Sequence, residues 1–418
     1  MSQEAAFSWE ILQSQSQLCS LYAEQVLYLL VEIRPAAALQ GKRLPLNLCL
    51  VIDRSTSMQG ARLEHVKEAA YQIIDTLHDD DTMAVVTFND RPDVVLASQS
   101  GASRAYAKAR ISTMSASGGT EILQGLRAGL LEIAKHHNEQ VLSHLILLTD
   151  GQTYGDEGNC ITEARLAGAH RIGITAMGIG EDWNDVLLDE MAAQSGGVSA
   201  YIASPGQVQA LLQQRVRGLG SVFAQGVTLK VHSAEGVHVE TVFRTSPYLE
   251  RLAPDGDTIH LGTLQTDAPL AVVMEVGVAQ KPPGEYKLAQ LELAGDVPAL
   301  GRQGEQLQHD VHCTFTPAEP PTEAIPAAIR SALSQATLYR MQEQAWNALD
   351  SGDVEAASHR LEMMATRLFD LGEVQLARSA MLEAERMAQG GAPTAKGRKE
   401  LKYGTRSLTI ASRRRSYD

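Results

Sequence analysis

Short, almost wholly apolar runs alternate with helical stretches between residues 45 and 220, and this alternation constrains the fold more than any other feature of the sequence. A strand that is apolar on both faces is typical of a parallel sheet covered by helices on both sides. We therefore predict an α/β domain with a mainly parallel central sheet over residues 45–220. The four clearest runs are Asn47–Asp53, Met83–Phe88, Leu142–Thr149 and Ile172–Ile179.

On either side of this domain the hydrophobic period changes to two, which is typical of strands with one buried face. Leu27, Leu29, Val31 and Ile33 alternate with other residues near the N-terminus, and about five short alternating runs follow residue 220. The N-terminal strand lies outside the α/β domain and needs a sheet to pair with. We predict that residues 1–44 and 221–316 form one antiparallel β-sandwich, into which the α/β domain is inserted.

Residues 321–390 have helical periodicity and no strand signal, and a proline-rich linker at Thr316–Pro321 precedes them. Asp350–Ala357 resembles Asp370–Ala377, and each contains a Gly where one helix should end and the next begin. We predict a small bundle of helical hairpins. Its simplest role is packing, and a groove for a protein partner is the alternative.

Residues 391–418 are predicted to form a basic, solvated tail. Lys396–Asp418 holds eight Lys or Arg and two acidic residues, a charge of +6, and the total of −14 therefore leaves −20 on the remainder. The net charge argues against nucleic-acid binding by the whole protein, and the tail lacks the basic stripe and stacking aromatics that such binding uses. Within the tail, Lys402–Ile410 alternates apolar and polar residues, so docking as an added strand is an alternative.

Cysteine usage and the N-terminal sequence indicate the compartment. The four cysteines are scattered without a CxxC pair, which argues against a disulfide framework and structural zinc. The first residues lack a signal-peptide pattern, and no apolar run approaches the roughly 20 residues of a membrane helix. We expect a cytoplasmic protein with reduced thiols and no membrane span. The cysteines are Cys19, Cys49, Cys160 and Cys313.

Oxygen-bearing side chains gather at positions where the predicted parallel strands end. Asp53, Ser55 and Ser57 follow the first strand, Thr120 precedes a helix, and Asp150 follows a later strand. Ligands bind at this edge of an open α/β sheet, and hydroxyl and carboxylate oxygens suit Mg²⁺, Mn²⁺ or Ca²⁺. We predict a divalent-cation site. For Asp53-x-Ser-x-Ser taken alone, a helix N-cap is the alternative interpretation.

The motifs Asp-x-Ser-x-Ser, Ser-Gly-Gly-Thr and Leu-Thr-Asp-Gly, in this order, resemble the von Willebrand factor type A (vWA) domain of the intracellular bacterial type. Ala176–Gly180 and Leu188–Tyr201 also match. The resemblance covers about residues 45–220 and implies a Rossmann-like fold with a metal-ion-dependent adhesion site (MIDAS). It implies that Ser55, Ser57 and Thr120 bind Mg²⁺ through hydroxyls. It also implies that Asp53 and Asp150 lie close by, often reaching the metal through water.

The surroundings of this site depart from the family in one place. Many relatives have Gly at the position of Thr56, whose side chain is bulkier. Gln59, Gly60 and Ala61 stand where a neighbouring second cation site would need acids, so we expect none there. Ordinary loop residues are the alternative to a binding rim. The predicted rim consists of Arg54, Thr56, Met58, Gly119, Gln152, Tyr154 and Trp183.

We expect a protein–protein interaction module rather than an enzyme, with the cation coordinating an Asp or Glu of a partner protein. The resemblance implies partners such as an ATPase or an assembly complex. A self-assembling scaffold that uses the basic tail is one alternative. A magnesium-dependent phosphatase-like hydrolase is another, because Asp53 follows an apolar strand as in haloacid-dehalogenase-like enzymes. Those enzymes need a second Asp where Ser55 stands.

Overall fold

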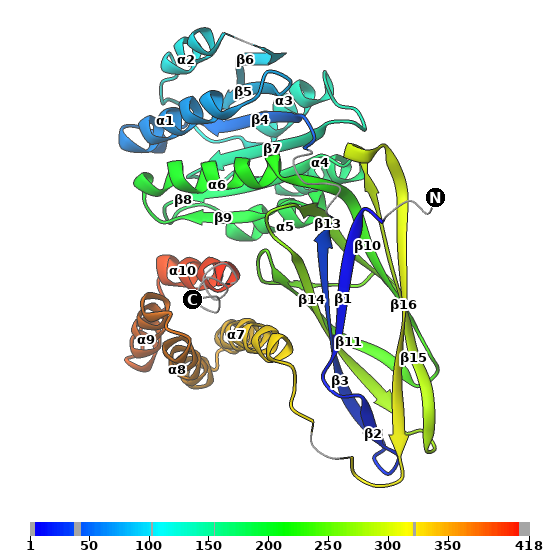
Figure 1. Cartoon of the computed structure of the whole chain (residues 1–418). Helices are drawn as coiled ribbons and strands as arrows, with labels where there is room; N and C mark the ends of the chain where they lie inside the picture. Colours follow the sequence, from blue (N-terminus) through cyan, green and yellow to red (C-terminus); the bar gives the residue numbers. More distant parts are fainter. Residues whose placement is uncertain (1–4, 37–42, 102, 154, 321–322, 409–418) are drawn as a thin grey trace. The chain divides into compact units, whose positions relative to one another are not determined.

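A computed structural model of the chain describes residues 5–36, 43–101, 103–153, 155–320 and 323–408. The chain divides into two compact units, which are described separately. One unit is Lys42–Val222, and the other combines Met1–Gly41 with Phe223–Asp418 (Figure 1).

The unit Lys42–Val222 is built on a six-stranded sheet with the order β6-β5-β4-β7-β8-β9. Neighbouring strands are parallel except β5 and β6, which are antiparallel. Every residue of β4 and β7 is buried, because apolar side chains face helices on both sides. The predicted mainly parallel sheet is confirmed. The strands are β4 (Leu46–Asp53), β5 (Thr82–Phe88), β6 (Pro92–Ser100), β7 (Leu142–Thr149), β8 (Gly173–Ile179) and β9 (Ser199–Ile202).

Two groups of helices cover this sheet (Figure 1). One group has α1 in contact with α2 and α6, and the other joins α3, α4 and α5 in succession. Glycine lets α3 lie close to the sheet, since a Cβ at Gly129 would be 2.4 Å from Cγ2 of Val51. The helices are α1 (Ala61–Thr76), α2 (Arg104–Ser112), α3 (Ile122–Ala134), α4 (Glu157–Ala169), α5 (Asp185–Ser195) and α6 (Val208–Gly220).

The other unit contains a sandwich of two five-stranded sheets, ordered β1-β3-β14-β11-β12 and β13-β10-β15-β16-β2. The N-terminal strand β3 is antiparallel to β1 and β14, so strands from both ends of the inserted domain share one sheet. The predicted insertion is confirmed, with β2 pairing in parallel to β16 as an exception to the antiparallel pattern. The strands are β1 (Phe7–Gln13), β2 (Gln17–Cys19), β3 (Glu24–Pro35), β10 (Val222–Ser233), β11 (Val237–Ser246), β12 (Glu250–Leu252), β13 (Thr258–Gln265), β14 (Leu270–Ala279), β15 (Gly284–Val297) and β16 (Arg302–Thr316).

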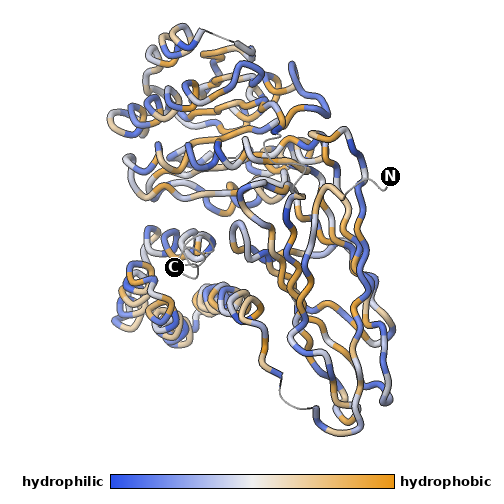
Figure 2. The backbone as a smooth tube through the Cα atoms, in the orientation of Figure 1, coloured by the Kyte–Doolittle hydropathy of each residue, from blue (hydrophilic) through white to orange (hydrophobic). Residues whose placement is uncertain are grey.

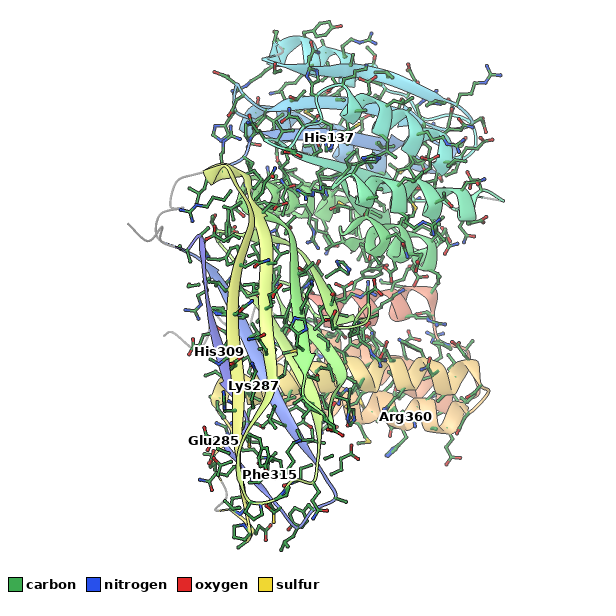
Figure 3. All side chains as sticks on the ribbon, turned by 90° about the vertical axis from the view of Figure 1, so that its right-hand side faces the viewer. His137, Glu285, Lys287, His309, Phe315 and Arg360 are labelled. Carbon is green, nitrogen blue, oxygen red and sulfur yellow. The ribbon has the colours of Figure 1, made fainter. Side chains whose placement is uncertain are left out.

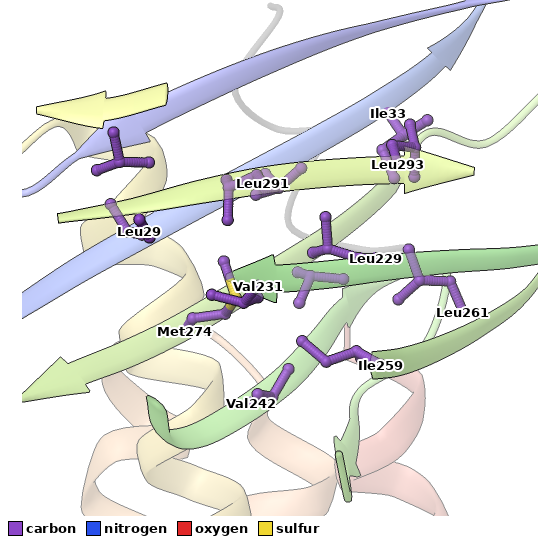
Figure 4. Packing of buried hydrophobic residues seen from close by; sticks show 14 of the residues in the cluster. Leu29, Ile33, Leu229, Val231, Val242, Ile259, Leu261, Met274, Leu291 and Leu293 are labelled. Atoms are coloured by element: carbon purple, nitrogen blue, oxygen red, sulfur yellow. The ribbon is translucent and has the colours of Figure 1, made fainter. Parts of the chain in front are cut away.

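Alternation along these strands creates the core between the two sheets. Leu29 of β3, Leu229 of β10 and Leu291 of β15 are buried there (Figure 4). On β15 and β16 the intervening residues face solvent, so Lys287 and His309 are exposed (Figure 3). Colouring by hydropathy shows the same alternation of apolar and polar residues along the sandwich strands (Figure 2).

The described C-terminal region is helical, and the predicted hairpins are confirmed. Gly352 and Gly372 have φ angles of 86° and 78° and stand between successive helices, as the internal repeat predicts. Ile329, Ala332 and Ala336 of α7 are buried in one cluster with Leu30 and Val273 of the sandwich. The helices are α7 (Ala327–Asp350), α8 (Val354–Asp370), α9 (Val374–Ala388) and α10 (Ala395–Ser407).

The prediction of a solvated tail or an added strand is wrong for Ala395–Ser407, which forms α10. Leu401 and Thr405, four residues apart on one helix face, are fully buried. Thr394 caps the helix by accepting a hydrogen bond from Gly397 N at 2.8 Å. The alternation of Lys402–Ile410 is compatible with a strand, but packing of Leu401 in the helical core selects the helix. Residues 409–418 lie outside the described residues.

The four cysteines are free thiols and are buried. Across the described ranges, each helix is either too short or too polar to cross a membrane.

Candidate metal centre

The candidate site lies at the carboxyl ends of β4 and β7. In the strand order β6-β5-β4-β7-β8-β9, β5 and β6 lie on one side of β4 and β7 to β9 on the other. The strand order therefore reverses between β4 and β7, which is the switch point of the sheet. Ligands bind at such points because the connecting loops diverge there. Asp53 is the last residue of β4, and Asp150 directly follows β7.

Asp53 is held rigidly by its neighbours. Its side chain is fully buried, its Oδ1 accepts a hydrogen bond from Ser55 N at 2.7 Å, and its Oδ2 accepts one from Thr149 Oγ1 at 2.6 Å. Burial raises the pKa of this carboxyl, and the charge of Asp150 adds to the rise, while the hydrogen bonds lower it. A nearby cation would favour the charged form and oppose the effect of burial.

The two serines after Asp53 form an oxygen cluster with Asp150. Ser55 Oγ and Ser57 Oγ are 3.0 Å apart, and Ser57 Oγ donates to Asp150 Oδ1 at 2.6 Å. Neither serine hydroxyl caps a helix: Ser55 stands at the N-cap of the short helix η2 (Thr56–Met58) without a side-chain cap hydrogen bond, and Gly60 precedes α1. The N-cap interpretation of Asp53-x-Ser-x-Ser is therefore wrong.

A second loop brings Thr120 to the same place. Thr56 N and Oγ1 both donate to Gly118 O, at 3.1 and 3.0 Å, and tie the two loops together. The Thr120 side chain lies against Gly151, where an added Cβ would be 2.9 Å from Thr120 Oγ1. The structure thus brings together all five residues predicted as metal ligands, from three separate loops.

The donor set fits a divalent cation. Octahedral Mg²⁺ with bonds of about 2.1 Å places neighbouring ligand oxygens about 3.0 Å apart. The separations in the cluster are 3.0 Å between the serine hydroxyls and 2.6 Å from Ser57 to Asp150. Three hydroxyls and two carboxylates are hard ligands, which Mg²⁺, Mn²⁺ and Ca²⁺ all accept.

Sequence reasoning missed two residues of this site. Arg62, on the first turn of α1, pairs with Asp150 Oδ2 and donates from Nη1 to Ser57 O at 3.1 Å. Thr149 donates to Asp53. Thr149 stood within the Leu-Thr-Asp-Gly motif, where its position at a strand end was a usable signal. For Arg62 the usable signal was a basic residue on the helix that follows the first loop.

The predicted rim is only partly present. Thr56, Gly119 and Gln152 are exposed, Arg54 is half-buried and donates from Nη1 to Ser117 Oγ at 3.0 Å, and Tyr154 lies outside the described residues.

Two of the predicted rim residues require correction. Met58 is fully buried, because η2 turns it inward. Trp183 is 2% exposed, packs on Gly178, and donates from its indole N–H to Gly180 O at 2.8 Å. Neither side chain can contact a partner.

Comparison with known proteins agrees with this architecture. The family model of the von Willebrand factor type A domain matches residues 47–214. The model of the Sll0103-like, C-terminal alpha-helical domain matches residues 327–411. The protein sll0103 of Synechocystis sp. is 31% identical over 335 residues, covering 78% of this chain and 79% of that protein. The chain belongs to the Sll0103-like family. It carries a vWA domain and this family's C-terminal helical domain.

Two solved structures share the fold over most of the chain. A von Willebrand factor type A protein from Catenulispora acidiphila has a TM-score of 0.75 at 21% identity, covering 97% of each chain. The ArnB paralog VWA2 from Sulfolobus acidocaldarius has a TM-score of 0.58 at 15% identity, covering 97% of this chain and 100% of that one. At these identities the similarity establishes the fold alone.

Proposed function

We propose that this Sll0103-like protein is a cation-dependent protein–protein interaction module. Ser55, Ser57 and Thr120 would hold a divalent cation, Mg²⁺ first among them, with Asp53 and Asp150 beside it. The observation that carries this proposal is the convergence of hydroxyl and carboxylate oxygens from three loops at one sheet edge.

The chemistry of the donors supports a carboxylate as the partner group. Hydroxyl ligands are uncharged, so a bound cation would keep much of its positive charge and offer an open position to an external Asp or Glu. Thr56, Gly119 and Gln152 are exposed around this position. Gly119 N donates to Asp90 Oδ1 at 3.0 Å, and a Cβ at Gly119 would lie 2.7 Å from the same oxygen.

We also propose that the site is not catalytic. As a phosphatase-like nucleophile, Asp53 would need an accessible oxygen, whereas both of its oxygens accept hydrogen bonds in a buried setting. Ser55 stands where a second Asp would act as acid and base. Support for a scaffold that assembles through its basic tail is weaker, because α10 packs into the helical region of its own chain.

The setting is proposed to be the cytoplasm, with an ATPase or an assembly complex as the class of partner. Four buried free thiols are compatible with a reducing compartment.

The test combines metal binding with partner capture. Calorimetric titration with Mg²⁺ should show binding to the wild type and to Asp79→Ala, an exposed carboxylate before β5, but not to Asp53→Ala. Capture from source lysate should then yield a band only with wild type or Asp79→Ala, and only with Mg²⁺ rather than EDTA. Identical bands in every lane would refute the proposal.

A further inference from the structure

A second group of metal-binding side chains lies on the outer face of the sandwich, in the sheet β1-β3-β14-β11-β12. Glu24 of β3 and His238 and Glu240 of β11 bring one ligand atom each within 4.8 Å of the others. We name these three residues the strand trio. His238 Nε2 is 3.5 Å from Glu24 Oε1 and 3.6 Å from Glu240 Oε1.

These separations match a shared metal better than hydrogen bonds. An N–H···O hydrogen bond places its heavy atoms 2.7–3.2 Å apart. A tetrahedral Zn²⁺ with bonds of about 2.0–2.1 Å places its ligand atoms about 3.3 Å from one another. Both distances from His238 Nε2 exceed the hydrogen-bond range and lie within a few tenths of an ångström of the tetrahedral spacing.

The strand between β3 and β11 is shaped to admit the imidazole. Gly277 of β14 pairs with His238 on one side and with Val26 on the other. A Cβ at Gly277 would be 2.5 Å from His238 Nε2 and 3.0 Å from Glu240 Oε1. Glycine weakens a strand interior and often marks a close approach. Here its missing side chain lets the ring of His238 cross the middle strand toward Glu24.

The third ligand, Glu240, stands at an irregularity in β11. The pairing of β11 with β14 shifts between Val239 and Thr241, which leaves Glu240 as the extra residue. Glu240 follows His238 by two positions, so the two side chains lie on the same face of the strand, with Glu240 Oε1 3.6 Å from His238 Nε2.

We propose that the strand trio binds Zn²⁺ or a similar first-row divalent cation through one imidazole nitrogen and two carboxylate oxygens. The imidazole distinguishes this site from the oxygen-only metal centre, since nitrogen ligands favour Zn²⁺ over Mg²⁺. The two carboxylates would balance the charge of the ion. The trio is exposed, so water can complete the coordination. This site does not depend on the proposed function of the vWA domain.

The experiment titrates the full-length chain with Co²⁺, whose visible absorption is intense in a tetrahedral site, and then displaces it with Zn²⁺. Co²⁺ binding at the metal centre is suppressed in two separate conditions, by excess Mg²⁺ and by the Asp53→Ala substitution. One equivalent of Co²⁺ should bind in both conditions and be lost in His238→Ala. His232→Ala is the matched control, because His232 is an exposed strand histidine 3.2 Å from the single carboxylate of Asp257.

Two further variants keep the test decisive. Glu24→Gln preserves size and removes one ligand charge, and Gly277→Ala adds the methyl group that would displace His238. Each should weaken Co²⁺ binding by about 10- to 100-fold with unchanged circular dichroism. Equal Co²⁺ binding by His238→Ala and His232→Ala would overturn the proposal, and so would full binding by Gly277→Ala.

Discussion

The metal centre at the end of the parallel sheet and the strand trio on the sandwich differ in how firmly the protein holds their donor atoms. At the end of the parallel sheet, Asp53 is fully buried and both of its oxygens already accept hydrogen bonds. On the face of the sandwich, the side chains of His238 and Glu24 are 56% and 59% exposed, and no contact shorter than 3.5 Å joins them. The fold fixes the donors of the first site, whereas a cation would have to fix those of the second.

This contrast has an energetic consequence. Exposed long side chains lose rotamer freedom when they bind, which costs up to about 2 kcal/mol for each Glu. For buried donors, this loss of rotamer freedom occurs during folding, before any metal binds. The metal centre is therefore expected to discriminate by geometry, and the strand trio by the chemistry of its imidazole.

The largest expected effect is that of Asp53→Ala, which should impair the metal centre and leave the strand trio unaffected. We expect the affinity for Mg²⁺ to fall by about 100-fold or more, because a charged group beside the cation is removed. Binding of Zn²⁺ to the strand trio should stay unchanged. Calorimetry with each metal in turn measures both, and retained Mg²⁺ affinity would contradict the assignment of the metal centre.

Thr149→Val tests whether the buried carboxylate needs its hydrogen-bond donor. The variant keeps the shape of the side chain but leaves Asp53 Oδ2 without the Thr149 hydroxyl. We expect Mg²⁺ affinity to fall about 10- to 100-fold, as for other groups that orient metal ligands. Thr87→Val on neighbouring β5 is the control, since its hydroxyl reaches only the Asp93 carbonyl. Equal affinities of the two variants would show that the Thr149 hydroxyl does not orient Asp53.

A buried histidine in the parallel sheet makes stability depend on pH. His144 of β7 lies 2.8 Å from Thr175 Oγ1, and burial, with a smaller effect from Arg215, lowers its pKa to about 3. Below pH 6.5 the unfolded chain gains a proton there and the native chain does not. The contribution of neutral His144 to the free energy of unfolding is therefore fully present above pH 6.5. It falls by about 1.4 kcal/mol per pH unit as the pH decreases toward 3.

His144→Gln should remove this dependence. Denaturant unfolding at pH 7.5 and 5.5 gives the slope of the unfolding free energy against pH. The fluorescence of Trp183 reports unfolding, with Trp9 and Trp346 replaced by Phe. Relative to the same background with His144, the variant should lose about half a proton from the mean slope, or about 1.4 kcal/mol over the two pH units. An unchanged slope would mean that His144 titrates normally in the folded chain.

The smallest expected effect is that of Arg62→Gln. The guanidinium of Arg62 pairs with Asp150, so it competes with a cation for the same carboxylate. Because Arg62 is 33% exposed, solvent screens this competition, and we expect Mg²⁺ affinity to rise by only about three- to tenfold. Arg54→Gln is the control, because Arg54 contacts the neutral Ser117. A fall in affinity would instead make Arg62 a residue that positions Asp150.

The parts of the fold that follow from local patterns were predictable from sequence. The apolar run Asn47–Asp53 predicted a fully buried strand, and Gly352 and Gly372 predicted the helix ends. Motif order placed Asp53, Thr120 and Asp150 at one sheet edge. These signals are local, because side-chain period and backbone conformation depend on neighbouring residues.

Residues whose surroundings come from distant segments were not predictable in this way. Met58 and Trp183 appear in loops, yet tertiary packing buries both. The alternation of Lys402–Ile410 suits a strand, and the contacts of Leu401 in the helical core select a helix instead. Glu24 and His238 are more than 200 residues apart, and strand register alone brings them together.

By itself, the sequence determined most of the elements of this protein and the oxygen donors at the ends of β4 and β7, because hydrophobic period and motif order are properties of short segments. Only the tertiary structure decided which side chains are buried, that Arg62 meets Asp150, and that Gly277 opens a path from His238 to Glu24. Those relations depend on strand order and helix packing, which many distant residues set jointly.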